Sequence, residues 1–292
     1  MSVPFEFPTI MDDRPKCVYK YLHSERAGSI LEKLLMRFSQ ASVLNDAFEF
    51  KPALKGMGTR AELEQGVREM LLTRFPDIFV RIEAGYAPEK AAQIISDIVS
   101  KGADLMESHA NYDKSVKDVY RLLDENFGVL SLSETPESAL MWSHYGDGGR
   151  GFLIEFHPEH TWFWDKREER DSFRHLRRVK YLERAPAYFL NLPDEIALYT
   201  KGIEWSYEKE WRIIRNFNDA AVKVGPDGYG KDVMLFAVPP SSIKSVVIGY
   251  KATEESVQQL KSTVSVNTEL SHVTFQKAIL NDDGAIDILP ES

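Results

Sequence analysis

The sequence lacks the features that mark several large classes of protein. Cys17 is its only cysteine, which excludes an internal disulfide and a cysteine-based zinc site and makes a reducing cytoplasm the expected compartment. It has no long apolar run, and its first residues show no basic segment followed by an apolar one, so we expect neither a membrane span nor a secretory signal. Basic residues are outnumbered, 36 Lys and Arg against 45 Asp and Glu, and the net charge of −9 argues against sequence-independent DNA binding.

What the sequence does contain is the material for a folded core, with 292 residues of which 43% are hydrophobic. Alternating β-forming residues predict strands at 17–22, 37–39, 128–133, 151–156, 177–181, 210–215, 233–239, 245–250 and 272–280. Helical spacing predicts helices at 25–36 (with Ser24 as N-cap), 60–75, 88–110, 113–127, 138–145 and 252–264. Short strands interspersed with helices predict a single α+β domain, in which a mixed sheet carries flanking helices and a helical insertion at about 60–126.

Polar residues cluster in the first segments of this pattern. On a strand, Tyr19 and Tyr21 point to one face and Lys20 to the other, so they could line a pocket together with the nearby Arg37, Ser39 and Asn45. The alternative is that the tyrosines are core residues with solvated hydroxyls, and that Asn45 simply makes a turn.

The middle of the chain offers small hydroxyls and aromatic rings. Ser131 and Ser133 share one face of the strand 128–133, where they either leave room for the ring of a ligand or face solvent. The helix 138–145 presents His144 on one face and Trp142 with Tyr145 on another. The glycine-rich segment 146–151 would suit a phosphate, but a tight turn uses the same residues, and it is the preferred interpretation.

Three carboxylates in the second half of the chain are candidate catalytic or binding residues. Glu155 lies between two apolar residues of its strand and points away from them. In a strand, Glu208, Glu210 and Arg212 line one face, close enough for the two carboxylates to perturb each other's ionisation. One carboxylate could then stabilise an oxocarbenium-like centre while the other activates a nucleophile, the alternative being a solvated charged face. A run of seven Lys and Arg between 166 and 180 is either a local phosphate or nucleic-acid site or a charged solvated helix.

The ordered combination of these segments resembles the bacterial domain-of-unknown-function family 2971, over about residues 17–250. The residues that carry the resemblance are Tyr19–Tyr21, Arg37–Glu49, Leu130–Ser133, Met141–Tyr145, Gly151–Phe156 and Trp205–Arg212. This family name supplies no reaction.

A second resemblance, to ADP-ribosyltransferases of the arginine-serine-glutamate type, does supply one. Ser131-Leu132-Ser133 and Glu208-Lys209-Glu210 follow that family's order of an early basic or aromatic strand, a Ser-x-Ser strand and a late Glu-x-Glu strand. The resemblance implies that Glu210 is the catalytic carboxylate and that Glu208 orients or deprotonates the acceptor. It further implies that Lys20 or Arg37 is the basic residue, that both serines shape the nicotinamide pocket, and that Tyr21 or Tyr145 stacks on the ring. The other residues expected to bind substrate are Tyr19, Ser39, Asn45, Trp142, His144, Glu155, Trp205 and Arg212.

Three hypotheses follow for function. The first is an NAD-consuming enzyme acting inside the cell as a toxin or antiphage defence effector on a protein or nucleic-acid acceptor, without a structural metal and with a neutralising partner protein. The second is a metal-dependent nuclease that uses Asp46, Glu49, Glu155 and Glu208. The third is a non-catalytic module that binds a nucleotide or nucleic acid by stacking Trp142, Tyr145 and Trp205 on a base.

Overall fold

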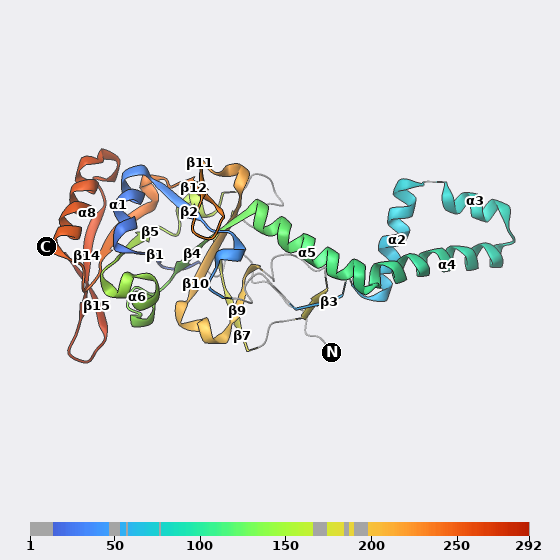
Figure 1. Cartoon of the computed structure of the whole chain (residues 1–292), viewed down its shortest axis with the longest axis horizontal. Helices are drawn as coiled ribbons and strands as arrows, with labels where there is room; N and C mark the ends of the chain where they lie inside the picture. Colours follow the sequence, from blue (N-terminus) through green and yellow to red (C-terminus); the bar gives the residue numbers. More distant parts are fainter. Residues whose placement is uncertain are drawn as a thin grey trace. The chain divides into compact units, whose positions relative to one another are not determined.

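The computed structural model describes residues 14–46, 53–56, 58–75, 77–165, 174–183, 187–189 and 198–291. The chain divides into two compact units, and Figure 1 labels most of their helices and strands. Unit 1 comprises 1–46, 126–183 and 199–292, and unit 2 comprises 47–125 and 184–198. The single domain expected from the sequence stays a prediction.

An eight-stranded mixed sheet forms the body of unit 1, in the order β15-β14-β13-β5-β1-β4-β10-β6. Its strands are β15 (Ile286–Pro290), β14 (Thr274–Leu280), β13 (Ile243–Ile248), β5 (Phe152–Phe156), β1 (Val18–Leu22), β4 (Phe127–Ser133), β10 (Glu210–Asn216) and β6 (Arg177–Arg178). β13 and β14 run parallel, and the other neighbours are antiparallel. The sheet and its helices confirm the predicted α+β class.

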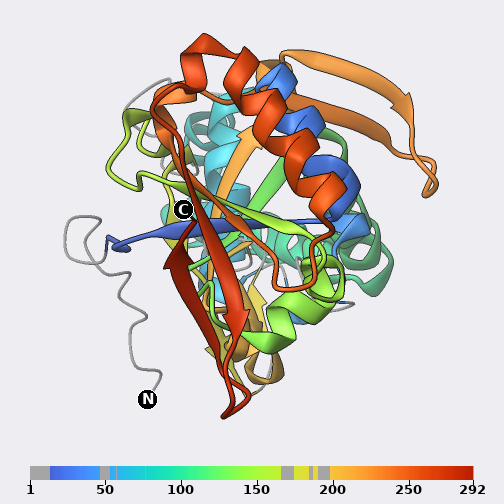
Figure 2. The same ribbon diagram turned by 90° about the vertical axis from the view of Figure 1, so that its left-hand side faces the viewer.

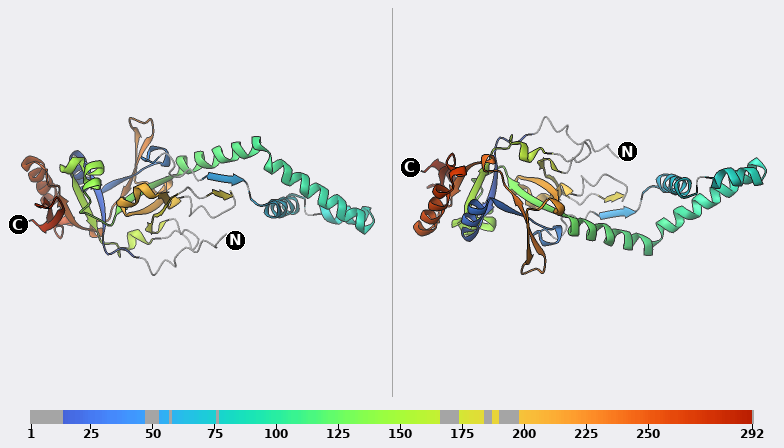
Figure 3. Two further views of the ribbon diagram at one scale, coloured as in Figure 1. Left: turned by 90° about the horizontal axis from the view of Figure 1, so that it is seen from below. Right: turned by 90° about the horizontal axis from the view of Figure 1, so that it is seen from above.

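Smaller elements complete unit 1. They are a three-stranded sheet of β11 (Val222–Pro226), β12 (Asp232–Ala237) and β2 (Leu35–Phe38), the parallel pair β7 (Lys180–Leu182) and β9 (Thr200–Gly202), and the helices α1 (Ser24–Lys33), α6 (Ala139–Tyr145) and α8 (Glu254–Val266). The hairpin β11–β12 reaches away from the rest of unit 1 (Figure 3), and every residue of β11 is exposed.

The two faces of the large sheet are covered differently. Helices α1 and α8 lie side by side over one face (Figure 2), where Leu31 and Leu260 join the main apolar core. Because side chains alternate along a strand, Tyr19 and Tyr21 belong to the opposite face. There they pack against Met141 and Trp142 of α6, in a smaller apolar cluster that leaves the ends of β4 and β10 to polar side chains.

Helices dominate unit 2. It contains α2 (Arg60–Arg74), α3 (Ile78–Gly85), α4 (Pro88–Glu107), all but the last residue of α5 (His109–Asn126), and the parallel pair β3 (Ala53–Gly56) and β8 (Ala187–Phe189). Thr59 and Glu62 form a capping box that starts α2, and Pro88 occupies the first turn of α4. The buried residues Ala91, Ile95, Val99 and Ala103 recur every four positions and give α4 one apolar stripe. The predicted helices at 60–75, 88–110 and 113–127 are thus confirmed, whereas α3 was not predicted.

Local predictions were wrong at three places. His23, not Ser24, is the N-cap of α1, and the Ser24 hydroxyl instead donates to Asp147. The same helix ends at Lys33 rather than at Met36, because Leu34 adopts a left-handed conformation and the chain continues as β2. Glu208 closes the 3-10 helix η5 (Ile203–Glu208) instead of lying in a strand, because Lys209 is left-handed at φ 43° and β10 starts only at Glu210.

Among the helices within the described ranges, none combines the length and the apolar character that a bilayer crossing requires.

Candidate functional site

A row of polar residues crosses the face of the large sheet on which α6 packs. Strand register places Ser245 opposite Glu155, Glu155 opposite Tyr19, Tyr19 opposite Ser133, and Ser133 opposite Glu210. Residues that oppose one another directly in antiparallel strands point to the same face, so these side chains share one surface. Because neighbouring strands are about 4.8 Å apart, Glu155 and Glu210 are separated by about 14 Å.

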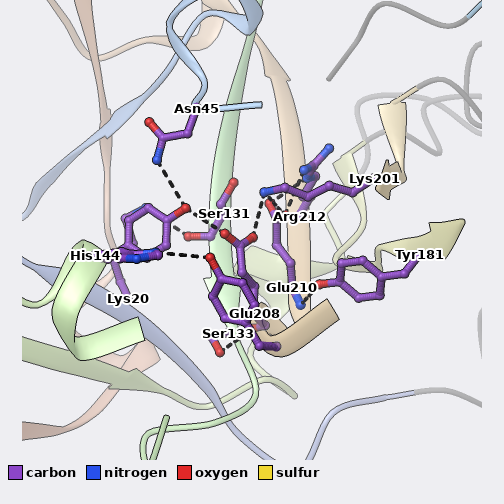
Figure 4. A network of polar contacts seen from close by, with 12 residues as sticks. Lys20, Asn45, Ser131, Ser133, His144, Tyr181, Lys201, Glu208, Glu210 and Arg212 are labelled. Atoms are coloured by element: carbon purple, nitrogen blue, oxygen red, sulfur yellow. Dashed lines mark hydrogen bonds and ion pairs between the residues drawn. The ribbon is translucent and has the colours of Figure 1, made fainter. Parts of the chain in front are cut away.

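Glu210 lies at the centre of a buried group of charges at one end of this row (Figure 4). Arg212 donates to both of its carboxylate oxygens, with Nε 2.6 Å from Oε1 and Nη2 2.8 Å from Oε2. Lys201 Nζ lies 3.3 Å from the same Oε2. We call Lys20, Lys201, Glu208, Glu210 and Arg212 the charge cluster.

Glu208 approaches Glu210 from the turn before the strand. Its Oε2 accepts a hydrogen bond of 2.7 Å from Lys201, and its Oε1 accepts one of 2.6 Å from the hydroxyl of Tyr145. Ser133 Oγ donates to the backbone oxygen of Glu208 at 2.6 Å, which ties the turn to β4. The two carboxylates are therefore neighbours, as the sequence predicted, although they do not share a strand face.

Burial changes the titration of the charge cluster. It raises the pKa of Glu210 to about 7, an effect that nearby Lys201 opposes and Glu208 reinforces. A hydrogen bond from Ser131 also favours the ionised form of Glu210 and lowers its pKa. Lys20 donates to the backbone oxygen of Ser131 at 2.9 Å, and burial lowers its pKa to about 8. A carboxyl group and an amine that both titrate near neutral pH are suited to acid–base work.

Aromatic side chains connect the charge cluster with the surface. Tyr145, Trp205 and Tyr207, which we call the aromatic rim, are all half-buried. The ammonium of Lys201 lies 4.8 Å from the centre of the Trp205 ring. At the outer side the exposed Asn45 donates to the Tyr145 hydroxyl at 3.2 Å, and the exposed His144 is within 3.1 Å of the Tyr207 hydroxyl. The rim thus lies between the two carboxylates and the exposed residues Asn45 and His144.

The structure brings together most of the residues expected at a site. These are Lys20, Asn45, Ser131, Ser133, His144, Tyr145, Trp205, Glu208, Glu210 and Arg212. Asp46 also belongs to this neighbourhood, since it is buried and its charge acts on Arg212.

Arg37 and Ser39 lie elsewhere. Arg37 projects from β2 of the smaller sheet and pairs with Asp227 at 2.7 Å. Ser39 joins its backbone to Val129 through two hydrogen bonds of 2.9 Å, which fixes the end of β2 to β4. Of the two candidates for the basic residue, Lys20 is therefore the one whose charge interacts with those of Glu208 and Glu210.

The buried rings of Tyr21 and Trp142 have packing roles. The Trp142 ring is fully buried, donates to the backbone oxygen of Pro136 at 2.7 Å, and meets Tyr21 edge to face at 5.4 Å. The Tyr21 hydroxyl donates to the backbone oxygen of Thr135 at 2.6 Å. Neither residue presents a free ring face, so both act as core residues; for Tyr21 this agrees with the core alternative, although its hydroxyl is bonded to the backbone instead of to solvent.

Glu155 is held in a separate polar group at the other end of the row. Lys244 Nζ and Ser245 Oγ donate to its carboxylate at 2.7 and 2.5 Å, and Tyr19 Oη lies 3.4 Å from it. It therefore does not join Glu208 in the carboxylate set required for a nuclease, and Glu49 of that set lies outside the described residues. In the described part of the chain, His, Cys, Asp and Glu side chains form no group of three that could hold a metal.

The glycine-rich loop and the basic segment also have structural partners. A Cβ on Gly151 would lie 2.1 Å from the backbone oxygen of Leu22, so this loop is a tight turn against β1, as preferred from the sequence. In the basic segment, Arg174 pairs with Asp219, and Arg178 pairs with Glu134 at 2.9 Å. Residues 166–173 of that segment lie outside the described residues.

Lys201, Tyr181 and Tyr207 are not among the site residues predicted from the sequence. Tyr181 of β7 accepts a hydrogen bond of 2.8 Å from the backbone N–H of Glu210, and Lys201 arrives on β9, the parallel neighbour of β7. The pairing of β7 with β9 depends on tertiary structure, so no local pattern could have placed Lys201 between the two glutamates.

Comparison with protein-family models gives a match over residues 141–213, to a family described as a protein of unknown function, DUF2971. The matched range runs from α6 to β10 and contains His144, Tyr145, Lys201, Glu208, Glu210 and Arg212. Lys20 and Ser131 precede it. Neither the curated proteins nor the solved structures yield a match.

Proposed function

We propose that the part of the chain similar to DUF2971, together with β1 and β4, cleaves the N-glycosidic bond of NAD⁺ and transfers ADP-ribose to water or to an acceptor. One observation carries the proposal: Ser133 and Ser131 on β4 directly oppose Glu210 and Arg212 on β10. Lys20 reaches the same place from β1, the neighbour of β4 on its other side. The basic, serine and glutamate elements implied by the transferase resemblance therefore lie on three adjacent strands.

The reaction needs a fixed negative charge where positive charge develops. When the bond between ribose C1′ and the nicotinamide nitrogen breaks, the electron pair leaves with neutral nicotinamide and the ribose becomes oxocarbenium-like. The Glu210 carboxylate stabilises that charge, and its pairing with Arg212 and Lys201 fixes its position before the reaction. A water or acceptor hydroxyl then bonds to C1′ and gives its proton to Glu208, so that the products are nicotinamide, the ADP-ribosylated acceptor and one proton.

The aromatic rim receives the flat nicotinamide ring in this scheme. Tyr145, Trp205 and Tyr207 take the stacking role, because Tyr21 lies in the core. Ser131 of β4 is half-buried and small, and in this scheme it is the residue past which a ring approaches the carboxylates, while the buried Ser133 holds the Glu208 turn. Depletion of NAD⁺, or uncontrolled ADP-ribosylation of a protein or nucleic acid, harms the cell, so the proposed activity suits a toxin or defence effector that a partner protein neutralises.

The test is to measure nicotinamide release from NAD⁺ by chromatography, with and without cell extract. We expect release by the wild-type protein and a loss of about 100-fold or more in Glu210→Gln, the size of effect typical for removing a charge-stabilising group. Glu155→Gln is the matched control, since it also removes a buried carboxylate from the same sheet face. Absence of release by folded wild-type protein, or equal losses in both variants, would overturn the proposal.

A further inference from the structure

Lys201 occupies the space between the two carboxylates of the charge cluster. It lies at the centre of β9, and its side chain is buried. Its ammonium is 2.7 Å from Glu208 Oε2 and 3.3 Å from Glu210 Oε2, so one cation contacts both acids. The indole ring of Trp205 packs against the same ammonium.

The other hydrogen-bond partners of the two carboxylates differ from each other. Arg212 contacts Glu210, and the remaining oxygen of Glu208 accepts from Tyr145, which is neutral. Lys201 is thus the one cation shared by both carboxylates among the contacts of the described residues. Two buried carboxylates this close repel each other when both are ionised, and a shared ammonium offsets that repulsion.

We propose that Lys201 is a positioning residue that holds Glu208 and Glu210 side by side in their ionised forms beneath the aromatic rim. It does not touch the reacting atoms. Its effect is to keep Glu208 able to accept a proton and Glu210 able to stabilise positive charge at the same time. The part of this inference that concerns turnover rests on the proposed function, whereas its effect on the two carboxylates does not.

Other titratable and charged groups contact Lys201 or its partners, or act on them through their charge. They are Lys20 of β1, Asp46 after the turn 41–43, Tyr145 and His144 of α6, Tyr181 of β7, Tyr207 and Glu208 of η5, and Glu210 and Arg212 of β10. Of these, the tyrosines stay neutral, because burial raises the pKa of Tyr145, Tyr181 and Tyr207 above the ordinary value. The cationic neighbours Lys20 and Arg212 remain when Lys201 is replaced, so a variant at Lys201 reports on its own charge.

The experiment follows the carboxyl carbons of Glu208 and Glu210 by ¹³C NMR through a pH titration, with assignment from Glu208→Gln and Glu210→Gln. In Lys201→Met we expect the apparent pKa of the pair to rise by about one unit or more. Lys201→Arg keeps the charge and should stay closer to the wild type. If Lys201→Met does not fold, Lys201→Gln also lacks the charge and carries the same test. Unchanged carboxyl titration in a folded, uncharged variant would overturn the inference.

Lys244→Met serves as the matched control, because Lys244 pairs with the other buried carboxylate, Glu155, at 2.7 Å. It should leave the titration of Glu208 and Glu210 unchanged. In Lys201→Met, the acid limb of the pH profile of nicotinamide release should move to higher pH by the same amount as the NMR titration. A shifted carboxyl titration in Lys201→Met, without nicotinamide release by the wild type, would support the positioning role of Lys201 and contradict NAD⁺ cleavage. Nicotinamide release with an unshifted titration and pH profile would support NAD⁺ cleavage and contradict the positioning role.

Discussion

Arg212 and Glu210, two positions apart on β10, form an ion pair that engages both carboxylate oxygens and is shielded from water. Residues two apart on a strand point to the same face, so the guanidinium lies along the strand and returns to the glutamate. The planar fork of arginine matches the geometry of a carboxylate, and the pair fixes Glu210 in one orientation.

Breaking this pair from one side should destabilise the fold. Arg212→Met leaves the buried Glu210 without its principal partner, and we expect the free energy of unfolding to fall by about 3–5 kcal/mol. The double variant Arg212→Met/Glu210→Gln removes the uncompensated charge and should recover a large part of the loss. Urea unfolding of the wild type, both single variants and the double variant measures the coupling. Additive losses in the double variant would mean that the two groups do not act as a pair.

The stability of the protein should depend on pH through Glu210. Its pKa is raised by burial from the ordinary 4.5 to about 7, so the folded state holds a proton that the unfolded state has already lost in this range. The stabilising contribution is complete below about pH 4.5 and disappears as the pH rises through about 7. We therefore expect the stability of the wild type relative to Glu210→Gln to decrease between these pH values. A difference that stays constant would contradict the raised pKa.

Lys20 should produce the opposite trend at higher pH. Burial lowers its pKa from the ordinary 10.5 to about 8, so the folded state loses this proton before the unfolded state does. The cost of burying the ammonium is present below pH 8 and vanishes by about 10.5. The stability of the wild type relative to Lys20→Met should consequently increase over that interval. Thermal unfolding of both proteins at matched ionic strength measures the difference, and a flat or falling difference would refute it.

Two glycines should respond to alanine in opposite ways. A Cβ on Gly151 meets the backbone oxygen of Leu22 at 2.1 Å, whereas a Cβ on Gly28 in α1 meets no atom within 4 Å. Gly151→Ala should therefore destabilise the protein, and Gly28→Ala should stabilise it by about 0.5–1 kcal/mol through helix propensity. Chemical denaturation of the two variants provides the comparison. A tolerated Gly151→Ala would show that the loop is not packed against β1.

The residues on strands could largely be predicted from the sequence, because a strand repeats every two positions. Ser131 and Ser133 share a face, and the strand at 210–215 carries Glu210 and Arg212 on one side. Pattern alone also indicated α6 and, in unit 2, the helices α2, α4 and α5, but not α3. These features depend on local spacing, which the sequence displays directly.

What the sequence could not show depends on single backbone conformations and on distant partners. The left-handed Lys209 moves Glu208 out of the strand, and the same conformation at Leu34 ends α1 early. Lys201 reaches the carboxylates through strand pairing between β7 and β9, and Glu155 is satisfied by Lys244 and Ser245 of a strand that follows much later. Such nonlocal contacts separate Glu155 from Glu208, although the sequence predicted both as site residues.

We expect NAD⁺ to bind where Ser131 and Glu210 meet, and equilibrium binding to an inactive variant tests this most directly. NAD⁺ titrated calorimetrically into Glu210→Gln should bind, and adding Ser131→Tyr, which replaces a small side chain next to Glu210 by a large one, should abolish binding. Ser271→Tyr, at an exposed position in the turn that follows Leu270, should leave binding unchanged. Failure of folded Glu210→Gln to bind NAD⁺, or undiminished binding when Ser131→Tyr is added, would contradict the account.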